Sequence, residues 1–282
     1  MPQDNHKRKF LKPSILSRIV LAASALIPFR GDFSPRIISK PTLYPLNKKV
    51  IAAHRGGTER HPENSTEAFE DAGEHSEEII ELDVRKSADD FIVYHNSRIK
   101  GRAIKNLSYQ NIKKLISYHV PTLNQALQII KKHNKVVIID IKEKGSETKI
   151  LKSAKKILPQ NKIIISSKNP ESLRIIKETD LKIKTTLVVG NSISQIGNLI
   201  RTKLGIVPWK NIRYSSADYV SIDGKFLNPL FYRNAKKGNI GILVYGLERA
   251  KPIRAALQRP QVYGVITYNP SKAIEQRNKL KT

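Results

Sequence analysis

Cysteine is absent from this chain of 282 residues, and tryptophan and methionine occur once each. Without cysteine, a disulfide scaffold, a zinc-finger protein and a thiol enzyme are excluded. Acidic residues are scarce, because 24 Asp and Glu stand against 51 Lys and Arg and give a formal net charge of +27. This excess indicates an anionic partner, which could be a nucleic acid, a lipid surface or a phosphorylated substrate.

A long hydrophobic run is missing at the N-terminus as well. Residues 1–18 are basic, and the uncharged apolar run 19–29 that follows has only eleven residues. At a rise of about 1.5 Å per residue, such a run is too short for a hydrocarbon core of about 30 Å. We expect residues 1–30 to be a signal-peptide-like or anchor segment, with an amphipathic helix packed on the domain as the alternative. Residues 31–48, interrupted by prolines, are expected to be a linker.

This N-terminal segment determines the expected localisation. It predicts a protein that is exported, periplasmic or membrane-associated, and a cytoplasmic protein if the segment is not a signal. Residues 1–50 contribute ten Lys and Arg against two acids, so +19 of the net charge remains for the rest of the chain.

The rest of the chain alternates short β-branched runs with helical patterns. Strand, helix and strand in this order predict a parallel sheet, and eight nearly continuous apolar strands predict a closed (β/α)8 TIM barrel over residues 49–282. An open doubly wound sheet is the alternative. The expected strands are 50–53, 79–84, 136–141, 163–166, 184–189, 219–223, 241–245 and 262–267, with 91–94 as an extra candidate. The expected helices are 65–75, 122–133, 148–158, 171–179, 229–237 and 249–258, with Thr122 and Ser172 near N-caps. Residues 191–216 are expected to form a long loop or irregular helix.

Three carboxylates occur near the ends of these strands, where active sites of such barrels lie. Glu81 and Asp83 are two residues apart, so they project to the same face of a strand, and Asp140 lies at the end of the adjacent one. Carboxylates that share one cavity repel each other unless a cation lies between them, and Mg²⁺ and Ca²⁺ prefer oxygen ligands. The alternative is that Glu81 pairs with a Lys or Arg outside the barrel.

Two histidines, His54 and His95, stand at the ends of strand-like runs on either side of the carboxylate pair. Imidazole exchanges protons near neutral pH, so the two rings are candidates for a general acid and a general base. Arg55 and Lys142 are candidate cations for phosphate oxygens. The other histidines are expected to be surface or structural residues.

These residues lie in a series of motifs that resembles the glycerophosphodiester phosphodiesterase family over about residues 49–275. The motifs are His54-Arg55-Gly56, Pro62-Glu63-Asn64-Ser65, Ala68-Phe69, Glu81-Leu82-Asp83-Val84, Val93-Tyr94-His95, Val120-Pro121-Thr122-Leu123, Ile139-Asp140-Ile141-Lys142, Ile165-Ser166-Ser167 and Gly264-Val265-Ile266-Thr267. The N-terminal combination is specific, whereas a single His-Arg-Gly would be weak.

The resemblance implies a TIM barrel that binds one divalent cation, Ca²⁺ or Mg²⁺, through positions matching Glu81, Asp83 and Asp140. His54 and His95 match the acid/base pair, Arg55 and Lys142 match phosphate contacts, and Glu63 matches a carboxylate that supports the first histidine or the substrate. The implied reaction cleaves a glycerophosphodiester through a cyclic phosphate to glycerol 3-phosphate and an alcohol. A lysolipid headgroup is a related substrate.

Four departures from the family's pattern affect what the resemblance implies. Asp140 stands where the family has Glu, and Asn96 replaces the Asp that follows the second histidine. Tyr245-Gly246 replaces a Trp-Thr pair of the substrate pocket, and Thr267-Tyr268-Asn269-Pro270 replaces Thr-Asp-x-Pro. Because the first half carries the cation ligands and both histidines, we expect the chemistry to be retained and the substrate preference to change.

A second interpretation keeps the fold without full activity. The charge and the four departures are also compatible with a catalytically weakened barrel that binds an anionic membrane surface or another polyanion. Nucleic-acid binding as the main role is not favoured, because Lys is spread along the chain and no recognition motif with interleaved aromatics is present.

Overall fold

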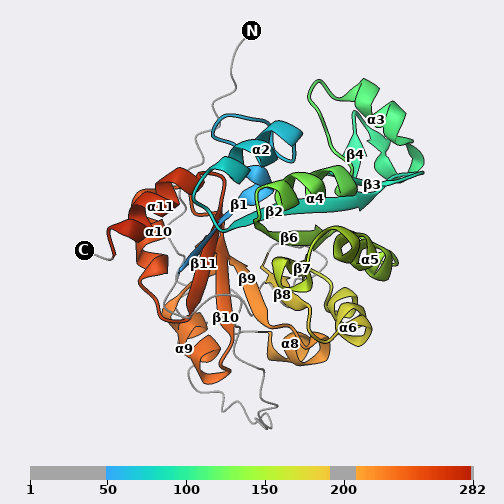
Figure 1. Cartoon of the computed structure of the whole chain (residues 1–282). Helices are drawn as coiled ribbons and strands as arrows, with labels where there is room; N and C mark the ends of the chain where they lie inside the picture. Colours follow the sequence, from blue (N-terminus) through green and yellow to red (C-terminus); the bar gives the residue numbers. More distant parts are fainter. Residues whose placement is uncertain (1–48, 191–207, 281–282) are drawn as a thin grey trace. The chain divides into compact units, whose positions relative to one another are not determined.

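The computed structural model describes residues 49–190 and 208–280. Eight parallel strands close into a barrel (Figure 1), in the order β1, β11, β10, β9, β8, β7, β6 and β2, with β2 again paired to β1. They are β1 (Val50–Ala53), β2 (Ile79–Lys86), β6 (Val136–Ile141), β7 (Ile163–Ser167), β8 (Lys184–Val189), β9 (Tyr219–Asp223), β10 (Gly241–Tyr245) and β11 (Val262–Thr267). The expected TIM barrel is confirmed, and the open sheet is excluded.

Helices surround this barrel on its outer side (Figure 1). They are α2 (Thr66–Glu74), α4 (Leu123–Lys132), α5 (Glu147–Ile157), α6 (Pro170–Thr179), α8 (Trp209–Ser215), α9 (Pro229–Lys237), α10 (Ala250–Leu257) and α11 (Pro270–Asn278). No helix within the two described ranges is long and apolar enough to cross a bilayer. The expected boundaries at residues 30 and 48, and most of the expected loop 191–216, lie outside these ranges.

Strand alternation separates two apolar layers. On β2, Ile80 and Leu82 join the large core between the strands and the outer helices, whereas Ile79 joins a second cluster inside the barrel. Val136 and Ile138 of β6 belong to the same inner cluster. Because side chains alternate along a strand, Glu81, Asp83 and Asp140 continue these inward rows toward the C-terminal ends of β2 and β6.

Helix starts follow their capping residues. Thr122 begins α4 with a full capping box, since its hydroxyl accepts from the Gln125 amide and the Gln125 side chain accepts from the Thr122 amide. Ser172 lies near the N-cap of α6, as expected, but it is the third helical residue and not the cap itself. Asn169 caps α6, because Pro170 fits the first helical position and the Asn169 side chain accepts from the Glu171 amide.

The strand β2 continues beyond the barrel and carries an additional hairpin. β3 (Phe91–Val93) pairs antiparallel to its end, with Val84 opposite Val93. The chain then forms two short paired strands, β4 (Arg98–Ile99) and β5 (Arg102–Ala103), followed by α3 (Tyr109–Leu115). A small apolar cluster that includes Ile92 and Ile99 holds this segment together.

A buried ion pair stabilises the opposite side of the barrel, where β8 begins. Lys177 Nζ lies 2.7 Å from Oδ2 of Asp218, and the same carboxylate accepts from the Thr185 amide at 2.8 Å. We expect Lys177→Met to lower the free energy of unfolding by about 3 kcal/mol, because Asp218 would remain buried without its cation. Urea denaturation measures this, with Lys155→Met, which breaks the more exposed pair with Asp180, expected to cost less than about 1 kcal/mol. Equal losses in the two variants would contradict the prediction.

Candidate active site

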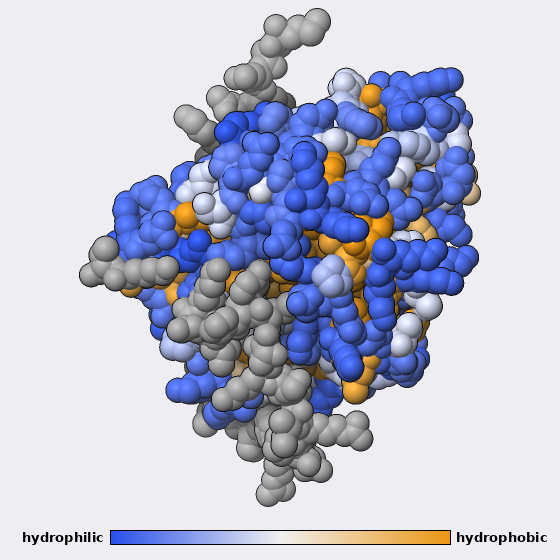
Figure 2. All heavy atoms as spheres, viewed as in Figure 1, coloured by the Kyte–Doolittle hydropathy of each residue, from blue (hydrophilic) through white to orange (hydrophobic). Residues whose placement is uncertain are grey.

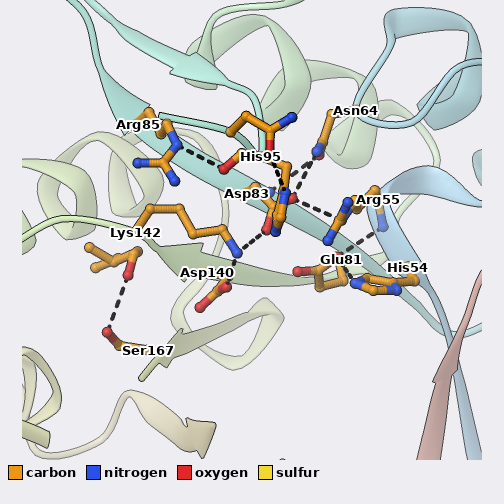
Figure 3. Close-up of polar contacts among 12 residues, drawn as sticks. His54, Arg55, Asn64, Glu81, Asp83, Arg85, His95, Asp140, Lys142 and Ser167 are labelled. Carbon is orange, nitrogen blue, oxygen red and sulfur yellow. Dashed lines mark hydrogen bonds and ion pairs between the residues drawn. The ribbon is translucent and has the colours of Figure 1, made fainter. Parts of the chain in front are cut away.

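The candidate site lies at the C-terminal ends of β1, β2 and β6 (Figure 3). Asp83 stands directly opposite Asp140 in the parallel register of β2 and β6, and Glu81 is one inward position earlier on β2. One carboxylate oxygen from each of the three lies within 4.8 Å of the others, and all three residues are buried. The interior placement of Glu81 is confirmed, so the alternative of a surface ion pair outside the barrel is wrong.

Two cations approach this carboxylate triad from opposite sides (Figure 3). Lys142 Nζ lies 2.5 Å from Oδ1 of Asp83 and also donates to Oδ2 of Asp140. Arg55 Nε lies 3.0 Å from Oδ2 of Asp83. Arg55 and Lys142, which were expected to contact phosphate oxygens, therefore also offset the negative charge of the triad.

The carboxylates differ in their pKa values because their neighbours differ. Burial, followed by the negative charge of Asp83, raises the pKa of Glu81 well above its usual value. Burial acts in the same direction on Asp83, but the positive charges of Lys142 and Arg55 outweigh it and lower the pKa of Asp83 to about 2. Among the described residues Glu81 forms no ion pair with a Lys or Arg, and the positive charges of Lys142 and Arg55 do not outweigh its burial.

The triad fits a hard divalent cation. Oδ1 of Asp140 is buried and has no hydrogen-bond donor among the described residues, and Oδ1 of Asp83 has only its ion pair. Buried carboxylate oxygens are normally satisfied by donors or by a metal ion. The donor set consists of three carboxylates, with no sulfur or imidazole among them. Such an oxygen-rich set is typical of sites for the hard cations Ca²⁺ and Mg²⁺.

His54 is the first residue after β1 and lies in a tight turn, His54–Gly56. Its Nε2 is 3.8 Å from Oε2 of Glu81, and its Nδ1 is buried without a hydrogen-bond partner in the described part of the chain. Burial and the positive charge of Arg55 lower the pKa of His54 to about 3. The turn requires glycine at position 56, where φ is 86° and a Cβ would lie 2.8 Å from that of Ala68.

His95 reaches the site from the loop that follows β3. The Tyr94 amide donates to the Asp83 carbonyl at 2.9 Å, and Arg85 Nε donates to the His95 carbonyl at 2.8 Å, so the backbone is fixed on both sides of the ring. The ring Nδ1 lies 3.2 Å from Oδ1 of Asn96. Burial is the main effect that lowers the pKa of His95, and the contact with Asn96 acts in the opposite direction.

The two remaining site residues of the sequence analysis lie around this centre. Glu63 accepts from Nη1 of Arg55 at 2.7 Å, so its contact is with the guanidinium of Arg55. Tyr245 ends β10 on the other side of the barrel, and its hydroxyl donates to the Val189 carbonyl at 3.4 Å. Burial raises the pKa of Tyr245, so its hydroxyl stays neutral.

Sequence reasoning missed two residues that hold the site together. Asn64 donates from Nδ2 to Oδ2 of Asp83 at 2.9 Å and accepts from the Asp83 amide at 3.3 Å. Tyr268 stacks on the His54 ring with centroids 4.3 Å apart and an interplanar angle of 28°. Asn64 was visible as part of a motif and Tyr268 only as a departure from the family's pattern, and neither signal indicated a contact.

The stack on His54 leads to a prediction for Tyr268. We expect Tyr268→Leu to lower kcat about two- to tenfold with little change in KM, because a ring pair of this kind contributes about 0.5–1.5 kcal/mol to holding the imidazole. Tyr268→Phe keeps the ring face and should remain close to the parent. Steady-state kinetics on a soluble glycerophosphodiester measure both variants, and equal losses in the two would contradict a role for stacking.

Comparisons with known proteins agree with this geometry. The model of the glycerophosphoryl diester phosphodiesterase family matches residues 54–272. A glycerophosphodiester phosphodiesterase from Caldanaerobacter subterraneus is 27% identical over 250 residues, which cover 80% of this chain and 97% of the relative.

Solved structures show the same fold. A glycerophosphodiester phosphodiesterase from Parabacteroides distasonis superposes with a TM-score of 0.69 at 20% identity and covers 83% of this chain and 98% of its own. A phosphodiesterase from Oleispira antarctica, solved in complex with its product sn-glycerol-3-phosphate, has a TM-score of 0.67 at 18% identity and covers 81% and 96%. The match of the family model over most of the barrel is decisive, and the chain therefore belongs to the glycerophosphoryl diester phosphodiesterase family, a family of hydrolases.

Proposed function

We propose that this protein is a metal-dependent enzyme that cleaves glycerophosphodiesters to glycerol 3-phosphate and an alcohol by acid/base catalysis with two histidines. The observation that carries the proposal is the buried triad of Glu81, Asp83 and Asp140, whose oxygens lie within 4.8 Å, with an imidazole 3.8 Å from one of its members. Family membership supports the reaction class.

The triad is assigned to one divalent cation, Ca²⁺ or Mg²⁺. When bound, such a cation offsets the negative charge of the phosphate and lowers the pKa of a neighbouring hydroxyl. Asp140 is one methylene shorter than the Glu that the family's pattern has at this position, so it reaches less far from β6. We expect the shorter side chain of Asp140 to affect the preference of the site between the larger Ca²⁺ and the smaller Mg²⁺.

Arg55 and Lys142 are assigned to the phosphate oxygens. Arg55 offers a planar fork that is already held by Glu63 and Asp83, so little freedom is lost when it binds an anion. Lys142 offers a point charge, and its carboxylate partners raise its pKa against the effect of burial. Both side chains therefore stay charged at neutral pH.

The two imidazoles are assigned to the proton transfers. One ring takes the proton of the glycerol hydroxyl next to the phosphorus, that oxygen forms the cyclic phosphate, and the other ring gives a proton to the departing alcohol. Water then opens the cyclic phosphate, with the two rings exchanging roles. The first half-reaction leaves the two rings with exchanged protonation states and the second restores them, so the full cycle needs no further acid or base.

The alcohol moiety, which decides the substrate, would lie toward the second half of the barrel. Tyr245 stands there, where the family's pattern has a tryptophan, and a lysolipid headgroup is as compatible with the assignment as a glycerophosphodiester. The product bound to the Oleispira antarctica relative supports glycerol 3-phosphate as the common product. An anionic membrane surface is the proposed second partner, and export or membrane association through residues 1–30 stays a prediction.

The alternative function, a barrel that binds membranes or polyanions without turnover, is not favoured. Nothing in such a role calls for three buried carboxylates and two oriented imidazoles at one set of strand ends.

The proposed function is tested by a substrate screen. Purified protein is incubated with a panel of glycerophosphodiesters and lysophospholipids in the presence of Ca²⁺, Mg²⁺ or Mn²⁺, and glycerol 3-phosphate is measured by a coupled assay. We expect cation-dependent release from at least one substrate. Absence of glycerol 3-phosphate with every substrate and every cation would contradict the proposal.

A further inference from the structure

The segment between His95 and Pro121 forms a distinct surface, which we call the basic lobe and define as residues 96–120. It contains the β4–β5 hairpin and α3, built over an apolar cluster of Ile92, Ile99, Ile104, Leu107 and Ile112. The hairpin turns at Lys100 and Gly101, both with positive φ, as in the tight turns that connect antiparallel strands.

The lobe stands on the same face of the barrel as the candidate active site. Its first residue, Asn96, follows His95 directly, and its end is fixed where the Val93 amide donates to the Pro121 carbonyl at 3.0 Å. The Ala88 amide, beyond the C-terminal end of β2, donates to the Leu107 carbonyl at 2.9 Å. Any external surface that binds the lobe would therefore also face the C-terminal strand ends at which the candidate active site lies.

The lobe carries positive charge without acidic residues to offset it. The chain contains no Asp or Glu from residue 91 to residue 139. Within the parts of the chain that the structure describes, none of the lobe's basic side chains forms an ion pair with a carboxylate, in contrast to Arg85, Lys132 and Lys177. The lobe's six basic residues are all exposed: Arg98, Lys100, Arg102, Lys105, Lys113 and Lys114.

The lobe's surface is charged and not apolar. Over α3 and β4, Figure 2 shows mainly hydrophilic residues. The large exposed hydrophobic residues of the described chain, Leu181 and Tyr214, lie outside the lobe. Such a surface attracts an anionic layer electrostatically without inserting into it, so binding should depend strongly on salt.

We propose that the basic lobe docks the enzyme onto the anionic phospholipid surface of a membrane, with the candidate active site facing the lipid headgroups. A membrane fits better than a nucleic acid, because the lobe adjoins a site for phosphodiesters of glycerol and its helix α3 has only seven residues, Tyr109–Leu115. The orientation of the site rests on the proposed function, whereas the binding surface itself does not.

Charge removal tests the proposal. Lys100→Gln, Arg102→Gln and Lys105→Gln are combined in the full chain, and binding to phosphatidylserine-containing vesicles is measured by sedimentation. Each basic residue near an anionic membrane contributes a factor of about five, so the triple variant should bind about 100-fold more weakly. Binding of the parent should fall steeply between 0.1 M and 1 M salt and be weak on purely zwitterionic vesicles.

A matched control changes the same charge on the opposite face. Lys156, Lys236 and Lys237 are exposed residues at the C-terminal ends of α5 and α9, which lie away from the C-terminal ends of the strands. Their combined replacement by Gln should change vesicle binding less than ~threefold, because these charges lie more than a Debye length from the docked surface. Equal losses in the two triple variants would overturn the proposal, since they would indicate attraction by net charge alone.

The contact surface is located with a fluorescent label, which the cysteine-free chain accepts at one chosen position. A label on Gln110→Cys in α3 should be quenched by headgroup-labelled lipid, whereas a label on Gln258→Cys, at the end of α10, should not. Unchanged vesicle binding of the lobe variant would overturn the proposal, and so would quenching at position 258 alone. Binding of the parent and of the lobe variant to RNA is compared in parallel. A lobe variant that loses RNA binding and keeps vesicle binding would also overturn the proposal. Sedimentation needs no turnover, so a protein that docks but releases no glycerol 3-phosphate contradicts only the proposed function.

Discussion

Replacing His54 by glutamine is expected to lower kcat by about 10²–10⁴-fold, which is the usual contribution of a positioned acid or base. The same is expected for His95→Gln. His54 lies beside Glu81 of the triad, and His95 is held by backbone contacts to the same strand, so each ring can serve one of the two proton transfers. Steady-state kinetics with a saturating cation measure both variants.

His119→Gln provides the control for this pair. His119 is exposed, and its backbone carbonyl, not its ring, accepts from the Thr66 amide. The activity of the His119→Gln variant should therefore equal that of the parent. The double variant should lose little more than the worse single variant, because groups that act as a unit are not additive. Two single variants that each retain more than half of the parent's kcat would exclude a two-histidine mechanism.

Asp83→Asn is expected to have the second large effect. Asp83 forms ion pairs with Arg55 and Lys142 and is one of the three candidate metal ligands. Its backbone amide and its side chain both form hydrogen bonds with Asn64. Removing its charge should weaken cation affinity by more than the roughly 10–100-fold that changes around a ligand cause, with a corresponding loss of turnover at fixed cation concentration. Calorimetric titration with Ca²⁺ or Mg²⁺ measures the affinity directly.

Glu143→Gln is the matched control for Asp83→Asn. Glu143 also follows β6, but it pairs with Arg85 away from the triad and is partly exposed. Its replacement should leave cation affinity unchanged. Equal affinity in the parent and in Asp83→Asn would remove Asp83 from the ligand set.

The barrel was predictable because its signals are local. Each strand is a short apolar run, as in residues 136–139, and period-two alternation alone places Glu81 and Asp83 on one face. Asp140 was expected on the neighbouring strand, and the register confirms it opposite Asp83. The start of α6 shows the limit of such signals, since Ser172 marks it only approximately and the cap itself is Asn169, followed by Pro170.

The contacts that complete the site depend on closure of the barrel and were not predictable. Tyr268 stacks on His54 only because β11 pairs with β1, which lies more than 200 residues earlier in the chain. The double role of Lys142 has the same origin, because its reach to Asp83 depends on the pairing of β2 with β6. Periodicity carries no information about such cross-strand partners.

A cation titration of metal-free protein, with a soluble glycerophosphodiester as substrate, tests directly whether the carboxylate triad holds the divalent cation that turnover needs. We expect glycerol 3-phosphate release to be near background without a divalent cation and to rise to a plateau as Ca²⁺ or Mg²⁺ binds with a stoichiometry of about one. The release should be strongly reduced in Asp83→Asn. Full turnover by chelator-treated protein, or an unchanged titration curve in Asp83→Asn, would contradict this expectation.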